Sequence, residues 1–294
     1  MPGHPLWTPL ILLAAMLLLS ALSAAARNQE ITLQLALELS AEGNTQAAAL
    51  ELRRLSLMAA EPEQQAGYAW AAAHEYGRAD SWETADNLLN RAEQHAPQLE
   101  MPVLLLRAES AAAQRNLAEA DFYFQIIRDN PRTDADLRRY AARRGAVMLT
   151  RMGDTTAAEQ ALATVADEDN GLAALEHYRQ GRDKKPMLGG LLGIIPGLGY
   201  AYAGEYANAL RSAILNGLFI FGMVHTAQHD QWGAFAAISF FEVTWYSGSI
   251  YGGLDATHRF NRRRQQSCLD GIMGQAAYSP DFKQLPLISL QFEF

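Results

Sequence analysis

Two stretches of the chain decide its fold class: TQAAALELRRLSLMAA at residues 45–60 and SWETADNLLNRAEQHA at residues 81–96. In both, apolar residues recur three and four positions apart, with alanines between them. This spacing places apolar side chains on one face of an α-helix, whereas a half-buried strand would alternate apolar and polar residues. The helical pattern continues from Ile31 to about Glu176. We therefore predict an all-α chain.

Prolines and polar turns divide this region at regular intervals. Pro62, Pro97 and Pro131 are 35 and 34 residues apart, and we expect each to close a helix. Small and large apolar residues follow the turns at helical spacing, so we expect them to be buried where paired helices approach each other. These residues are Ala85, Leu88, Ala92, Ala120, Phe124, Ile127, Ala158 and Ala161.

This period resembles the tetratricopeptide repeat, a pair of antiparallel helices in about 34 residues. The resemblance covers residues 27–181, with three or four degenerate repeats. It implies a stack of helix pairs whose concave surface binds a protein partner. Tyr68, Trp70, Tyr76 and Trp82 are candidates for lining that surface, and the helix core is the alternative location for them.

The first 26 residues have the features of a signal peptide. Residues 10–22 form an apolar block, and small residues precede a cleavage site after Ala26. We therefore expect residues 27–181 to be exported. Because residues 1–9 lack Lys and Arg, an uncleaved anchor helix is the alternative. Cys268 is the only cysteine, which excludes an intramolecular disulfide and a cysteine-based metal cluster.

The composition becomes apolar after GRDKKP, and we assign residues 182–264 to a membrane module. We predict helices near residues 187–204, 208–227 and 232–253, each long enough to cross about 30 Å of hydrocarbon. Arginines from 259 to 264 follow the last helix, and such residues normally stay in the cytoplasm. Three crossings of the inner membrane then place the repeat domain in the periplasm and the membrane module in contact with membrane lipid. A buried helical hairpin in a soluble protein is the alternative.

Two motifs, IIPGLGYAYAGEYANAL at residues 194–210 and YSGSIYGGLDATHRFN at residues 246–261, carry a second resemblance. They are similar to a bacterial membrane module with a Pro-Gly-x-Gly-x-x-Tyr-x-Gly opening. The resemblance implies an envelope protein of a family associated in some members with tetratricopeptide repeats or membrane-protein insertion factors. This chain has Tyr200 where glutamine is common and Ser249 where asparagine is common. The motif residues are Pro196, Gly197, Gly199, Tyr202, Gly204, Asn216, Glu242, Gly248, Tyr251, Gly252 and Asn261.

Glu242 is the strongest single candidate for a functional side chain. A carboxylate inside a spanning helix is unfavourable unless it is paired, protonated or faces a polar interior. We expect Asn216 and Tyr202 to be its partners, in a hydrogen bond that locks the helices or in a proton or ion path. Gly248 and Gly252 are four residues apart and predict close helix packing.

Other chemistry finds little support in the sequence. Residues 27–185 carry 18 basic and 25 acidic residues, which disfavours a nucleic-acid partner. His225 and His229 share a helical face, but no third zinc ligand stands at a set spacing. We predict no enzyme activity, no metal and no cofactor.

The chain closes with a tail, residues 265–294, in which LISLQFEF alternates like a strand. A terminal strand of this kind makes the outer membrane an alternative location. We predict a cell-envelope scaffold that binds a protein partner in assembly, export or membrane-protein insertion. The sequence is also compatible with a homo-oligomer. The alternative is a small transport or channel component that uses Glu242.

Overall fold

The computed structural model describes residues 27–165 and 170–274, and these form helices joined by turns and short linkers, with no strand among them. The predicted all-α class is therefore confirmed for the described part of the chain. The signal peptide predicted for residues 1–26 and the strand predicted near the C-terminus lie outside the described residues. The chain divides into two compact units, whose described parts are residues 27–165 and 170–274.

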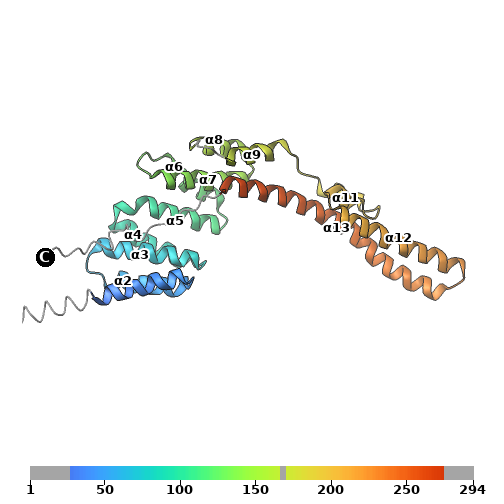
Figure 1. The fold of residues 1–294 in the computed structure, drawn as a ribbon, viewed down its shortest axis with the longest axis horizontal. Coiled ribbons are helices and arrows are strands. Elements are labelled where there is room, and N and C mark those ends of the chain that lie inside the picture. Colours follow the sequence, from blue (N-terminus) through green and yellow to red (C-terminus); the bar gives the residue numbers. More distant parts are fainter. Residues whose placement is uncertain (1–26, 166–169, 275–294) are drawn as a thin grey trace, which may run out of the picture. The chain divides into compact units, whose positions relative to one another are not determined.

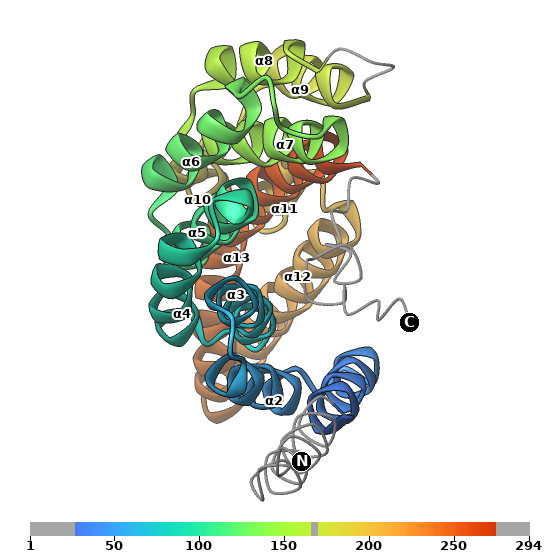
Figure 2. The ribbon, with the colours of Figure 1, turned by 90° about the vertical axis from the view of Figure 1, so that its left-hand side faces the viewer.

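Consecutive helices of the first unit pack against each other in chain order (Figures 1 and 2). Residues 27–41 are helical. After them come α2 (Thr45–Met58), α3 (Pro62–Arg78), α4 (Trp82–His95), a short 3₁₀ turn (Pro97–Leu99), α5 (Glu100–Ala113), α6 (Leu117–Asp129), α7 (Ala135–Met152) and α8 (Thr155–Ala163).

Local chemistry explains where these helices begin. The side chains of Asn44, Asp134 and Asp154 accept hydrogen bonds from the first-turn amides of α2, α7 and α8. Pro62 is the first residue of α3, where its missing N–H removes no helical bond. It therefore opens a helix, and the prediction that it closes one was wrong.

Small residues allow the helices of the first unit to approach closely. The alanines predicted at these positions are buried, as are the larger residues between them: Ala85, Leu88, Ala92, Ala120, Phe124, Ile127, Ala158 and Ala161. Their burial is the main sequence prediction about this core, and it is confirmed.

The second unit consists of α9 (Asn170–Gln180), α10 (Pro186–Leu192), α11 (Leu198–Ala203), α12 (Tyr206–Gln228) and α13 (Trp232–Met273), and each of the other four helices packs along α13 (Figure 1). Helix α12, which also packs on α13, agrees with the helix predicted near 208–227. The single helix predicted near 187–204 is replaced by two short ones, α10 ending at Leu192 and α11 beginning at Leu198. The interruption contains Pro196, which has no backbone N–H to continue α10, and Gly197, whose φ of +90° is not helical. Helix α13 continues past residue 253, so the first part of the predicted tail is helical.

Among the described residues, one helix is long and apolar enough to cross a membrane, judged by length and composition. This helix is α12, with a mean hydropathy of 1.4 over its most apolar 18 residues. Only 11% of that segment is buried inside the protein. Helix α12 therefore presents most of its apolar surface outward.

Candidate functional site

Glycines bring three backbones together where α10 and α11 meet α13. A Cβ atom on Gly253 would lie 2.5 Å from the Gly189 carbonyl oxygen and 2.9 Å from the Gly199 Cα. A Cβ atom on Gly193 would lie 2.7 Å from the Ser249 carbonyl oxygen. Such distances leave no room for a side chain, so these positions require glycine. Of these residues, only Gly199 belongs to the predicted motif set.

The Pro196–Gly197 turn is fixed by contacts to both long helices. A Cβ atom on Gly197 would collide with the Ala209 carbonyl oxygen of α12. Its backbone N–H donates a 3.4 Å hydrogen bond to Ser249 Oγ on α13. Gly204 ends α11 with a φ of +85°. The motif glycines at 197 and 204 thus allow a backbone conformation with positive φ that other residues rarely adopt.

The two glycines predicted to pack helices together behave differently. Gly252 faces the ring of Tyr200, and a Cβ atom there would overlap the tyrosine hydroxyl. Gly248 has no heavy atom within 4 Å of the position of a Cβ. The packing prediction was therefore right for Gly252 and wrong for Gly248. Tyr251, another motif residue, is 72% exposed and contributes nothing to this packing.

A buried polar seam joins the α10–α11 turn to α12 and α13. Ser249 Oγ donates to the Gly193 carbonyl oxygen at 3.1 Å and accepts from Ser212 Oγ at 3.2 Å. The side-chain amide of Asn216 donates to the Ser212 carbonyl oxygen at 2.6 Å. Ser212, Ser249 and Asn216 are all at least 92% buried. The linking role of Ser249 was not predicted, although a small polar residue in an apolar helix indicates a buried hydrogen bond.

Glu242 lies in the same helix pair, and its Oε2 atom has no hydrogen-bond partner within residues 27–165 and 170–274. Its side chain is buried, with 6% exposed. The Oδ1 atom of Asn216 is also buried and has no donor. The predicted second partner, Tyr202, is bonded elsewhere, because its hydroxyl accepts from the Lys185 backbone N–H at 3.1 Å.

A clamp built on Asn261 holds the start of α10. Asn261 Oδ1 accepts from the Lys184 backbone N–H at 2.9 Å, and Asn261 Nδ2 donates to the Lys184 carbonyl oxygen at 2.8 Å. The Lys184 ammonium donates to the Tyr202 carbonyl oxygen at 2.6 Å and lies 4.0 Å from the centre of the Phe260 ring. Both ends of the 184–202 segment therefore meet beside the same turn of α13.

An ion pair fixes the residue that follows this segment. Arg259 donates to both carboxylate oxygens of Glu205, at 3.0 and 2.8 Å. These hydrogen bonds from Arg259, with a further one from Asn208, lower the pKa of Glu205 to about 2. Neither Glu205 nor Lys184 was a predicted site residue, because their partners lie 54 and 77 residues away in the sequence.

Three of the four aromatic residues predicted to bind a partner belong to the core of the first unit. Tyr68, Trp70 and Tyr76 are 5%, 1% and 6% exposed. The prediction that they line a binding surface was wrong, because α2 and α4 both pack on α3 and cover them. Trp82 is only partly buried and packs against this core.

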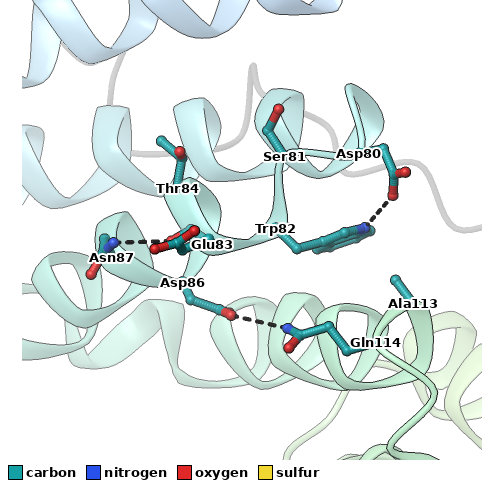
Figure 3. A pocket seen from close by; sticks show the side chains of 9 residues that line it. All are labelled: Asp80, Ser81, Trp82, Glu83, Thr84, Asp86, Asn87, Ala113 and Gln114. Atoms are coloured by element: carbon teal, nitrogen blue, oxygen red, sulfur yellow. Dashed lines mark hydrogen bonds between the residues drawn. The ribbon is translucent and has the colours of Figure 1, made fainter.

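Trp82 lines an open pocket of about 800 Å³ on the first unit (Figure 3). Its indole N–H donates to Asp80 at 2.9 Å, and Gln114 reaches Asp86 across the pocket at 3.5 Å. The lining is acidic and polar, with no basic side chain: Asp80, Ser81, Trp82, Glu83, Thr84, Asp86, Asn87, Ala113 and Gln114. The pocket therefore suits a cationic group better than an anion.

The first unit also contains a buried ionic cluster. The carboxylate of Glu75 is fully buried and accepts from Ser40 Oγ and Arg78 at 3.0 Å, with His74 Nδ1 at 3.2 Å. Burial alone would raise the pKa of Glu75, but the hydrogen bonds from His74 and Arg78 outweigh it and hold that pKa below its ordinary value. This cluster joins α3 to the helix at residues 27–41.

The two histidines considered for zinc contact each other. Their ring centres are 4.2 Å apart, and His229 Nδ1 is bonded to the His225 carbonyl oxygen, so that nitrogen faces backbone. Within the described ranges, no three His, Cys, Asp or Glu side chains are grouped as metal ligands.

No protein-family model, curated protein or solved structure matches this chain.

Proposed function

We propose that the chain is a membrane-anchored scaffold of the cell envelope, in which residues 182–264 form the anchor and a tetratricopeptide-like domain binds a protein partner. One observation supports the membrane anchor: the long helices of the second unit bury polar side chains and expose apolar ones. The buried polar residues are Ser212, Asn216, Thr226, Glu242 and Ser249. The exposed apolar residues include Leu210, Ile214, Leu218, Phe221, Val224, Phe240, Phe241 and Val243.

This polarity is the reverse of that in a water-soluble helix pair. Each Å² of apolar surface kept out of water stabilises a protein by roughly 25 cal/mol, so a soluble chain would turn these residues inward. Lipid removes that driving force, and small and polar residues then mediate contacts between helices. The polarity of α12 and α13 thus favours a lipid environment over the soluble hairpin considered above.

The clamp on Lys184 changes the number of crossings in the proposal. The two ends of the 184–202 segment meet at α13, which supports a re-entrant loop there. With α12 and α13 as the two crossings, the repeat domain and the end of α13 share one side of the membrane. We place both in the periplasm, following the predicted signal peptide. Arg259 and Arg264 are paired with Glu205 and Asp183, which reduces their value as a cytoplasmic signal.

Partner binding is assigned to the first unit. Its helices stack in chain order, as a repeat domain requires, and the acidic Trp82 pocket offers a place for a basic segment of the partner. Envelope assembly, export and membrane-protein insertion all need such a recruiting surface beside the bilayer.

Cysteine accessibility tests the anchor. Cys268 is 3% exposed and burial raises its thiol pKa, so it is a poor probe and is replaced by serine. Single cysteines then replace the exposed residues Gln94, Gln228 and Ser267. We expect an impermeant maleimide to reach positions 94 and 267 from the periplasm and position 228 only after lysis. Labelling of all three from one side would contradict two crossings.

A further inference from the structure

The α12–α13 pair contains a carboxyl group with no counter-ion. Glu242 is 6% exposed, and its buried Oε2 atom has no hydrogen-bond donor among the described residues. Two basic side chains of α12, Arg211 and His225, make contacts with other residues. Arg211 donates to Asn208 at 3.4 Å, and the His225 ring stacks on Phe221. An ionised Glu242 would therefore be a buried and uncompensated charge.

Asn216 supplies an acceptor that also lacks a donor. Its amide nitrogen donates to the Ser212 carbonyl oxygen at 2.6 Å, which fixes the orientation of the amide. The Oδ1 atom is left buried and without a donor. Two buried acceptors that both lack a donor are unfavourable, because each has lost its hydrogen bonds to water.

The register of the helices places both residues in the same part of the seam. Ser212 and Ser249 are in contact, with 3.2 Å between their Oγ atoms. Asn216 is one turn beyond Ser212 and Glu242 is two turns before Ser249, both toward the connection at residues 229–231. At 1.5 Å per residue, the two are offset by only about one helical turn. Glu242 lies about 15 Å from the start of α13, which is half the hydrocarbon thickness of about 30 Å.

We propose that Glu242 and Asn216 form a proton-binding site in the middle of the membrane module. A single proton on Glu242 removes its charge and converts one of the two acceptors into a donor. The neutral acid then donates its O–H to Asn216 Oδ1. Release of the proton restores the charge and leaves Glu242 Oε2 and Asn216 Oδ1 without a donor. Proton binding and the packing of α12 on α13 therefore stabilise each other.

This proposal rests on the membrane location proposed above, and a pair of carbodiimides tests it in full-length protein in liposomes. The apolar reagent dicyclohexylcarbodiimide enters the bilayer and modifies protonated carboxyl groups. A water-soluble carbodiimide reaches only exposed ones. At neutral pH we expect the apolar reagent alone to modify Glu242, detected by mass spectrometry of the peptide, with no adduct there in Glu242→Gln. Glu205 serves as an internal control, because its bonds to Arg259 keep it ionised.

Infrared spectroscopy tests whether Asn216 Oδ1 accepts the hydrogen bond from Glu242. The wild type should show a carboxylic-acid C=O band that is absent in Glu242→Gln. In Asn216→Leu this band should move to higher frequency, because the acid loses its hydrogen-bond acceptor. An unmoved band would overturn the role of Asn216.

The remaining outcomes separate this site from the anchor. If the cysteine labels show two crossings but Glu242 is unmodified, the anchor stands and the proton site is wrong. Modification by the water-soluble reagent would mean that Glu242 faces water, which also refutes the site. Protection by sodium at constant pH would identify a metal cation as the ligand in place of a proton. If the cysteine labels contradict two membrane crossings, the proposed function fails, and that measurement is independent of the carbodiimide test.

Discussion

Asn261 makes two hydrogen bonds to the backbone of Lys184, one to its N–H at 2.9 Å and one to its carbonyl oxygen at 2.8 Å. A single side chain thereby joins residues that are 77 positions apart in the sequence. It closes the 184–202 segment onto α13 and provides hydrogen-bond partners for backbone groups that lie before the first turn of α10.

Removing this clamp should loosen the second unit. Asn261→Leu leaves the Lys184 N–H and carbonyl without partners, and we expect a loss of about 1–3 kcal/mol in the free energy of unfolding. Denaturant titration in detergent measures it. Gln266→Leu is the control, because this exposed residue bonds only to Asp270, one turn away on the same helix. Equal stability of the two variants would contradict the clamp.

Two glycines on α13 form a matched pair for testing backbone contact. Gly253→Ala should destabilise the packing of α10 and α11, because its Cβ would lie 2.5 Å from the Gly189 carbonyl oxygen. Gly248→Ala meets no atom within 4 Å and should be neutral or stabilise the helix by up to about 1 kcal/mol. Thermal unfolding in detergent compares them. A Gly253→Ala protein as stable as Gly248→Ala would contradict the close approach.

The Glu205–Arg259 pair should make stability depend on pH. The pKa of Glu205 is about 2 in the folded chain against an ordinary value of 4.5, so its stabilisation is fully present above pH 4.5. It is lost as the pH falls from 4.5 toward 2. Because Arg259 is partly exposed, we expect at most about 1 kcal/mol at neutral pH. The unfolding free energies of wild type and Glu205→Gln should differ at pH 7 and converge near pH 2.

The buried Glu75 cluster should behave in the same direction. Its lowered pKa means that it stabilises the fold above the ordinary carboxyl pKa of 4.5 and loses that effect on acidification. Glu75→Gln should cost about 2–3 kcal/mol at neutral pH, because Arg78 and His74 lose their charged acceptor. Glu83→Gln, at an exposed position, is the control and should change the unfolding free energy by less than about 0.5 kcal/mol.

Charge reversal tests the Trp82 pocket as the partner-binding surface. Glu83→Lys should weaken recovery of the partner after crosslinking in cells, because it opposes a basic segment. Glu42→Lys makes the same change in charge at an exposed turn that does not line the pocket. Equal recovery with both variants would locate binding elsewhere.

The sequence predicted features that depend on neighbouring residues. Helical periodicity identified the buried alanines such as Ala85 and Ala120, and the unfavourable placement of a charge in an apolar helix drew attention to Glu242. It left open whether Tyr68, Trp70 and Tyr76 line a binding surface or the core, because their spacing is the same whether a neighbouring helix or solvent covers them. That distinction requires knowledge of the tertiary packing.

The missed parts of the site depend on contacts between distant residues. Ser249 looked like a weakened copy of a motif asparagine, yet its hydroxyl joins the turn at Gly193 and Gly197 to α12. Lys184 looked like one of several basic residues at a boundary. Only the return of the chain beside Asn261 gives it a structural role, and no local pattern encodes that return.

The length of α13 has a mechanical consequence. The helix runs without a break for 42 residues, about 63 Å, from beside the 229–231 connection to the region where α9 packs on it. A change in tilt around Glu242 that α13 transmits along its length would carry Cys268 and the docked α9 with it, as a lever about 39 Å long. In the proposed membrane location, an event inside the bilayer would thus produce a displacement well outside it.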